Sequence, residues 1–198
     1  METEEIREKK EPKRLPVWAC ILLFALGLFV CMGLYGTIGF GLLSLILGDE
    51  ARHPGLLVYT VTEANMLLSV LTPAVILLYF ERRPFSDLGL TLKGHVRGLW
   101  YGLLVAMLLY LIGFGLSLAI GEVEVTGFQF DPLNLLGTFV FCLLVALTEE
   151  IMMRGYILGR LLHTRMNKFL ALFVSALLFA LLHIFNPNVA FLPMLNLV

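Results

Sequence analysis

Charged side chains are scarce in this sequence. Only 15% of its 198 residues are Asp, Glu, Lys or Arg, whereas 59% are hydrophobic and the mean hydropathy is +0.90. Soluble domains carry about 25% charged residues and roughly 45–50% apolar ones, so the composition excludes a soluble globular domain. It indicates an integral membrane protein instead.

Three further patterns are missing, and each absence excludes a class of function. The formal net charge is −1 and the basic residues are spread over several segments, so no nucleic-acid partner is expected. The His-Glu-x-x-His zinc signature does not occur. The cysteines lie in apolar segments without disulfide or metal-ligand spacing, and we interpret them as small buried residues; they are Cys20, Cys31 and Cys142.

Five long apolar segments predict an all-α, polytopic bundle of transmembrane helices. Only helices and closed barrels satisfy every backbone polar group inside a bilayer, and unbroken apolar runs favour helices. Each segment is near or above the roughly 20 residues that cross a bilayer, although the last is short. The segments cover residues 17–47, 56–80, 99–120, 133–162 and 169–185, and the start of a further one lies near residue 189.

The distribution of charge divides the chain into three parts. Residues 1–16 form a charged tail, residues 17–80 hold two spans, and residues 81–198 form the core. Lys and Arg gather in the tail and in the second and fourth connections, whereas the third connection is acidic. The positive-inside rule therefore predicts a cytoplasmic N-terminus. The residues concerned include Arg82, Arg83, Lys93, Arg97, Arg160, Arg165 and Lys168 on the basic side, and Glu122, Glu124 and Asp131 on the acidic side.

Two adjacent carboxylates, Glu149 and Glu150, stand inside the otherwise apolar fourth segment. Ionisable residues at membrane depth are costly, and they indicate a functional site by default. On a helix, Glu150 and Arg154 are four residues apart and can form a buried structural pair. Glu149 has no such partner, so it is the residue expected to act as a general base.

His183, in the fifth segment, is the expected partner of Glu149. Phe179 lies four residues before it and can pack on the imidazole. A Glu on one helix and a His on the next could share a water molecule, which the carboxylate would deprotonate. Glu and His are also ordinary zinc ligands, so a divalent metal such as zinc stays open, although no cofactor is firmly implied. A purely structural ion-pair cluster is the other interpretation.

The run from Glu149 to Gly155 resembles the EExxxR motif of the CPBP family, and the run from Phe179 to His183 resembles its FxxxH motif. This is the family of CAAX proteases and bacteriocin-processing membrane proteases, also called Abi. The segment 82–90 is similar to the loop before the family's core helices, and Asn186 falls in the stretch that usually follows the second motif.

The resemblance implies an intramembrane endopeptidase of the CAAX-processing type, in a bacterial plasma membrane, that acts on a membrane-associated peptide or protein. It implies that Glu149 is the catalytic base, that Glu150 and Arg154 support it, and that His183 helps to activate water. Phe179 and Asn186 are expected to support the site or the substrate.

The family also carries a later helix with a second His followed by Asn or Asp, which has no match before Val198. We therefore expect a C-terminally truncated chain that lacks the last catalytic motif. The alternatives are a non-catalytic membrane protein of the same fold, such as a bacteriocin immunity or scaffold protein, and a proton-coupled carrier.

Overall fold

The computed structural model describes residues 15–53 and 55–184, and every regular element within these ranges is helical. The all-α, polytopic architecture predicted from the sequence is confirmed. In chain order the elements are α1 (Val17–Leu47), η1 (Gly48–Arg52), α2 (Leu56–Phe80), η2 (Phe85–Leu88), α3 (Val96–Ala119), α4 (Pro132–Glu149), η3 (Glu150–Leu158), α5 (Gly159–Leu162) and α6 (Lys168–Leu182).

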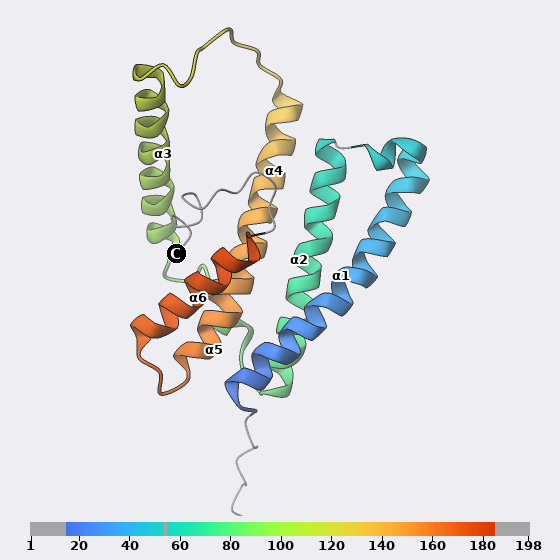
Figure 1. Cartoon of the computed structure of the whole chain (residues 1–198), viewed down its shortest axis with the longest axis vertical. Helices are drawn as coiled ribbons and strands as arrows, with labels where there is room; N and C mark the ends of the chain where they lie inside the picture. Colours follow the sequence, from blue (N-terminus) through green and yellow to red (C-terminus); the bar gives the residue numbers. More distant parts are fainter. Residues whose placement is uncertain (1–14, 54, 185–198) are drawn as a thin grey trace, which may run out of the picture.

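Four helical stretches are long and apolar enough to cross a membrane, and the fifth is shorter than predicted. The long stretches are Val17–Arg52, Leu56–Phe80, Val96–Ala119 and Pro132–Leu162. Helix α6 has 15 residues, or about 22 Å, less than the roughly 30 Å of a hydrocarbon core. It ends at Leu182, with His183 as its C-cap, rather than near residue 185, and it lies obliquely to the other helices (Figure 1). The further apolar segment near residue 189 lies outside the described residues.

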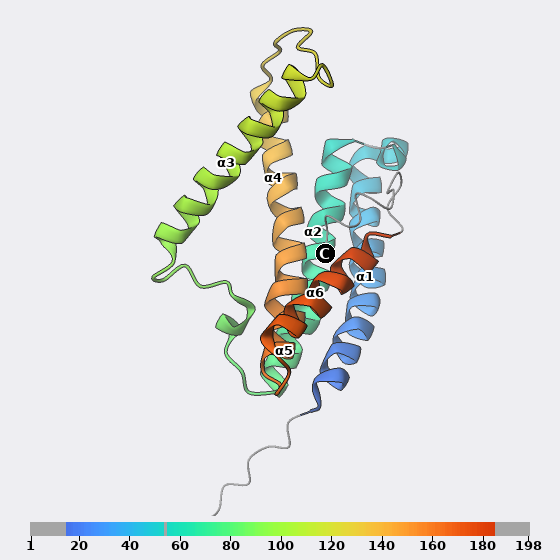
Figure 2. The same cartoon turned by 60° about the vertical axis from the view of Figure 1, so that its left-hand side comes forward.

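Helices α1, α2 and α4 lie side by side in both views (Figures 1 and 2). Small side chains allow the close approach of α1 to α2. A Cβ on Gly27 would lie 2.8 Å from the Cβ of Pro73, and a Cβ on Gly39 would overlap the side chain of Asn65. These two contacts explain why glycine occurs on this face of α1.

The buried core lies near the end of the bundle where α1 begins and α2 ends. Phe24 of α1 stacks on Tyr156 of η3 with ring centroids 4.4 Å apart, and both side chains are almost fully buried. The core therefore holds the segment that follows α4 against the first two helices. Its other members are Val70, Ala74, Leu77, Leu78, Leu88, Ile151, Met153, Ile157, Leu161 and Ala171.

Helix α3 stands apart from this core. It contributes no buried residue within the described part of the chain, and both views show it separated from α1 and α2 (Figure 2). Its large apolar side chains are exposed around the helix, as expected where lipid is the neighbour.

The prediction of small buried cysteines holds for only one of the three. Cys20 is buried, Cys31 is partly buried, and Cys142 is exposed on α4. All three are free. Cys142 is exposed because it lies on a helix surface that no described segment covers.

Candidate active site

The helix that carries the two carboxylates changes its hydrogen-bonding pattern at Glu150. Residues Glu150–Leu158 form a π-helix of nine residues between α4 and α5. The sequence predicts an uninterrupted α-helix here, so this widening is a correction to that prediction. π-Helical turns are rare, and they occur frequently at functional sites.

A glycine lets the connection between α2 and α3 pack directly on the π-helix. A Cβ on Gly155 would lie 2.7 Å from the carbonyl oxygen of Leu88, and one on Gly159 would lie 3.6 Å from the oxygen of Asp87. Gly155 ends the run that resembles the EExxxR motif. Leu88 lies in the segment 82–90, which resembles the loop before the core helices of the CPBP family. The structure therefore brings these two sequence features into backbone contact.

Glu150 and Arg154 form the ion pair that their spacing predicts. The pair is not buried, however: the side chains are 52% and 70% exposed within the described residues. Both side chains line a cavity instead of packing into the core. The surrounding protein does not enclose the two side chains. The prediction of a buried structural pair is therefore wrong in its burial, although the pair itself forms.

Glu149 faces His183, as predicted. The carboxylate oxygen Oε1 of Glu149 lies 3.5 Å from Nε2 of His183, with side chains 37% and 23% exposed. Nδ1 of the imidazole lies 2.9 Å from the carbonyl oxygen of Phe179. A carbonyl oxygen only accepts, so Nδ1 carries the proton of this hydrogen bond. Nε2 is thus the nitrogen that exchanges a proton with Glu149 or with a water.

Phe179 fixes the plane of the imidazole. Its ring centroid lies 4.4 Å from that of His183, and the two planes are inclined by 55°. His183 is the C-terminal cap of α6, so it stands at a helix end rather than within a helix. Asn186, the other supporting residue predicted from the sequence, lies outside the described residues.

A cavity of about 620 Å³ adjoins the two carboxylates. Its volume lies within the range of small-molecule sites. Charged groups line one part and apolar side chains the rest, so a peptide could place a polar backbone group near Glu149 while its side chains stay in apolar surroundings. The lining residues are Glu149, Glu150, Met153, Arg154, Leu158, Leu172, Phe173, Ser175, Ala176 and Phe179.

The described part of the chain supplies two close donors for a metal at this site, Glu149 and His183. No group of three or more His, Cys, Asp and Glu residues suited to a metal occurs in residues 15–53 and 55–184. Catalytic zinc sites use three protein ligands and a water. The described residues alone therefore do not make up such a ligand set.

A buried polar cluster beneath the π-helix is not evident from the sequence. Arg160 and Glu81 form an ion pair with side chains only 5% and 8% exposed, and Arg83 lies 3.5 Å from the same carboxylate. The thiol of Cys20 lies 2.7 Å from the other oxygen of Glu81. Arg160, which the positive-inside argument counts with the connection after the fourth segment, belongs to α5 and pairs with Glu81 at the end of α2. The only sign of this cluster in the sequence is the high density of charged residues in the segment 81–87.

Comparison with known protein families gives a match in the C-terminal part of the chain. Residues 131–198 match the family described as type II CAAX prenyl endopeptidase Rce1-like. No curated protein and no solved structure matches the chain. The matched region holds Glu149, Glu150, Arg154 and His183, the charged residues brought together here. The match over residues 131–198 is to a CAAX protease family, so the family resemblance that the two motifs predict is confirmed for this part of the chain.

Proposed function

We propose that this integral membrane protein is an endopeptidase that hydrolyses a membrane-associated peptide with a water activated by Glu149 and His183. The observation that carries the proposal is the 3.5 Å approach of the Glu149 carboxylate to Nε2 of His183 beside a cavity of about 620 Å³. The pair lies about 25 Å along the helix that begins at Pro132, so it is within the bilayer. A carboxylate at that depth costs folding free energy, so its presence there indicates a function.

The reaction begins with a water that contacts Glu149 and His183. Glu149 takes a proton from the water while the oxygen bonds to the scissile carbonyl carbon, and negative charge develops on the carbonyl oxygen. The proton then passes from the Glu149 carboxyl to the leaving nitrogen as the C–N bond breaks. The products are a carboxylic acid and an amine, which exchange a proton to become a carboxylate and an ammonium ion, and Glu149 returns to its starting state.

His183 orients the water and holds the proton between these steps. Because Nδ1 donates to Phe179, Nε2 can accept a proton from the carboxyl of Glu149 and return it. Phe179 keeps the ring in this orientation. The imidazole therefore needs no rotation during the reaction.

Arg154 and Glu150 complete the charge balance of the site. The guanidinium neutralises Glu150, so the carboxylate of Glu149 is not placed beside an unpaired negative charge. Both groups line the cavity, where they face the polar backbone of a bound peptide. We assign them a supporting role.

The test is cleavage of a membrane-tethered reporter peptide by the complete product of the coding region, reconstituted in lipid vesicles. Glu149→Gln and His183→Ala are each expected to lower kcat by about 10²- to 10⁴-fold, the usual contribution of a general base. Glu50→Gln is the matched control, because Glu50 is an exposed carboxylate in η1. Full activity in Glu149→Gln would rule out this mechanism. Activity that disappears with a chelator and returns with zinc would replace it with a metal-dependent one.

A further inference from the structure

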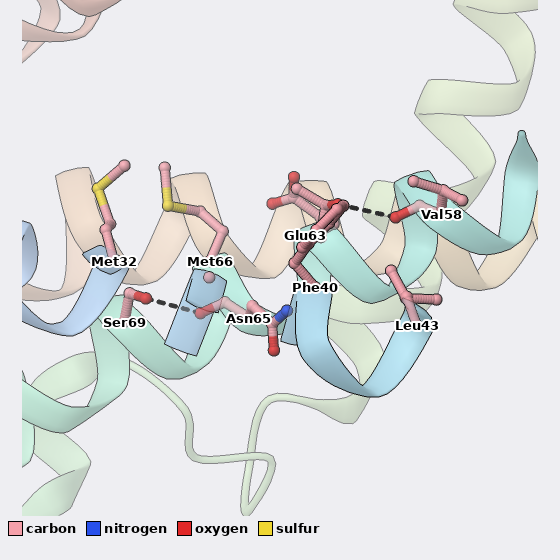
Figure 3. Close-up of a pocket in the computed structure, with 10 residues that line it drawn as sticks. Met32, Phe40, Leu43, Val58, Glu63, Asn65, Met66 and Ser69 are labelled. Atoms are coloured by element: carbon pink, nitrogen blue, oxygen red, sulfur yellow. Dashed lines mark hydrogen bonds between the residues drawn. The ribbon is translucent and has the colours of Figure 1, made fainter. Parts of the chain in front are cut away.

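A second cavity, of about 250 Å³, lies between α1 and α2 (Figure 3). It has no lining residue in common with the cavity beside Glu149. Its walls come from one face of α1 and from the first half of α2. The lining residues are Met32, Gly36, Phe40, Leu43, Val58, Thr62, Glu63, Asn65, Met66 and Ser69.

Among the described residues that line this cavity, Glu63 alone is ionisable. It lies about 10 Å along α2, a helix of 25 residues that crosses the membrane. Within the described residues, no Lys, Arg or His lies within ion-pair distance of its carboxylate. Glu149 and Glu150, in contrast, each face a basic side chain. Glu63 is thus a carboxylate within a membrane helix that lacks a basic partner in the described structure.

The cavity combines this carboxylate with an apolar wall. The side chains of Met32, Met66 and Glu63 project toward the same side of the two helices (Figure 3). Methionine is flexible and polarisable, and it adapts to apolar groups of varied shape. A Cβ on Gly36 would have no atom within 4 Å, so the absence of a side chain there keeps part of the cavity open.

The chemistry of the lining selects a class of ligand. Moving an unpaired ion from water into apolar surroundings generally costs several kcal/mol. A carboxylate in such surroundings therefore favours a ligand of opposite charge. One carboxylate matches one monovalent cation. Among the described residues, no three metal-binding side chains cluster here, so an organic cation fits the cavity better than a divalent metal.

We propose that this cavity binds an amphiphile that has an alkyl chain and a single ammonium group. The ammonium group donates hydrogen bonds to the carboxylate of Glu63, and the chain lies along Met32 and Met66. At about 250 Å³ the cavity is smaller than most drug-sized sites, so it holds the amine and the adjoining part of the chain. The site needs neither Glu149 nor His183.

The experiment measures binding of dodecylammonium to the full chain in neutral dodecylmaltoside micelles, with dodecanol as the uncharged probe of equal length. Wild-type protein is expected to bind the ammonium and to show a higher Tm in its presence. Glu63→Gln is expected to weaken binding about 10- to 100-fold, the range for a charged hydrogen bond. Glu50→Gln, which neutralises an exposed carboxylate, is expected to leave binding unchanged.

A second variant tests the shape of the cavity independently of charge. Gly36→Leu fills open space without a backbone clash, so it should abolish binding while the protein stays folded. Equal binding of dodecanol and dodecylammonium would overturn the proposal, as would unchanged binding in Glu63→Gln. Glu149→Gln should still bind the amine, so loss of the proposed peptidase mechanism and loss of this site are distinguishable.

Two sources could supply such an amine, a lipid of the bilayer and a free amphiphile. Dodecylammonium binding is therefore compared in bilayer discs of phosphatidylglycerol with and without phosphatidylethanolamine. Weaker binding in the mixed discs supports the lipid as the natural ligand, because its ammonium headgroup competes for Glu63. Equal binding supports a free amine at the same carboxylate.

Discussion

Gly155 lies directly against the backbone of Leu88: a Cβ added to the glycine would stand 2.7 Å from the Leu88 carbonyl oxygen. This contact joins the π-helix that carries Glu150 and Arg154 to the connection between α2 and α3. A carbonyl oxygen held in the backbone cannot rotate away as a flexible side chain can. The position of the candidate site thus depends on a contact that only glycine permits.

We expect Gly155→Ala to destabilise the protein by about 1–3 kcal/mol, the usual cost of forcing extra atoms into a packed site. The matched control is Gly98→Ala in α3, where a Cβ would meet no atom within 4 Å. There alanine should be neutral or should stabilise the helix by about 0.5–1 kcal/mol. Thermal unfolding in detergent measures both effects. Equal stabilities of the two variants would show that the Leu88 contact does not constrain the π-helix.

The ion pair between Arg160 and Glu81 is the buried clamp of this bundle. We expect Arg160→Met to destabilise by up to about 3–5 kcal/mol, because Glu81 would keep a buried charge with only Arg83 to balance it. Arg154→Met should cost less, since that pair lines a cavity and is not enclosed by the described protein. Denaturant unfolding of the two variants compares them. The double variant Glu81→Leu with Arg160→Met should recover most of the loss, and no recovery would contradict the assignment.

Phe179 is expected to act through the orientation of His183. Phe179→Ala removes the ring that packs on the imidazole but keeps the backbone carbonyl that accepts from Nδ1. Aromatic pairs contribute about 0.5–1.5 kcal/mol, so kcat on the reporter peptide should fall about tenfold or less, with KM little changed. His183→Ala should lower kcat much more than Phe179→Ala does. A larger loss in Phe179→Ala than in His183→Ala would contradict this order of roles.

The orientation of the chain in the membrane is open to a direct measurement. The beginning of α1, the end of α2 and the turn before α6 lie at one end of the molecule, and the acidic connection after α3 lies at the other (Figure 1). We expect the first end to face the cytoplasm. In a cysteine-free background, Glu124→Cys should react with an impermeant thiol reagent in intact cells, and Lys93→Cys should not. The reverse pattern would invert the topology.

Much of this site is a local property of the sequence. Unbroken apolar runs required helices, because a bilayer leaves no other way to satisfy the backbone. The spacing of Glu150 and Arg154 predicted their ion pair, and the spacing of Phe179 and His183 predicted their ring contact, since residues four apart share a helix face. The sequence also predicted that Glu149 and His183, on consecutive helical segments, could share a water molecule, and the two side chains lie 3.5 Å apart.

Long-range packing decided the rest. The contact of Gly155 in the π-helix with Leu88 joins residues that are 67 positions apart (155 − 88). The ion pair of Arg160 with Glu81 joins residues that are 79 positions apart. The cavity around Glu63 likewise exists only because α1 and α2 pack against each other. Helical periodicity determines which residues share one helix face. Only the tertiary structure determines which faces meet, because burial and ion pairing between distant segments depend on packing that no local pattern encodes.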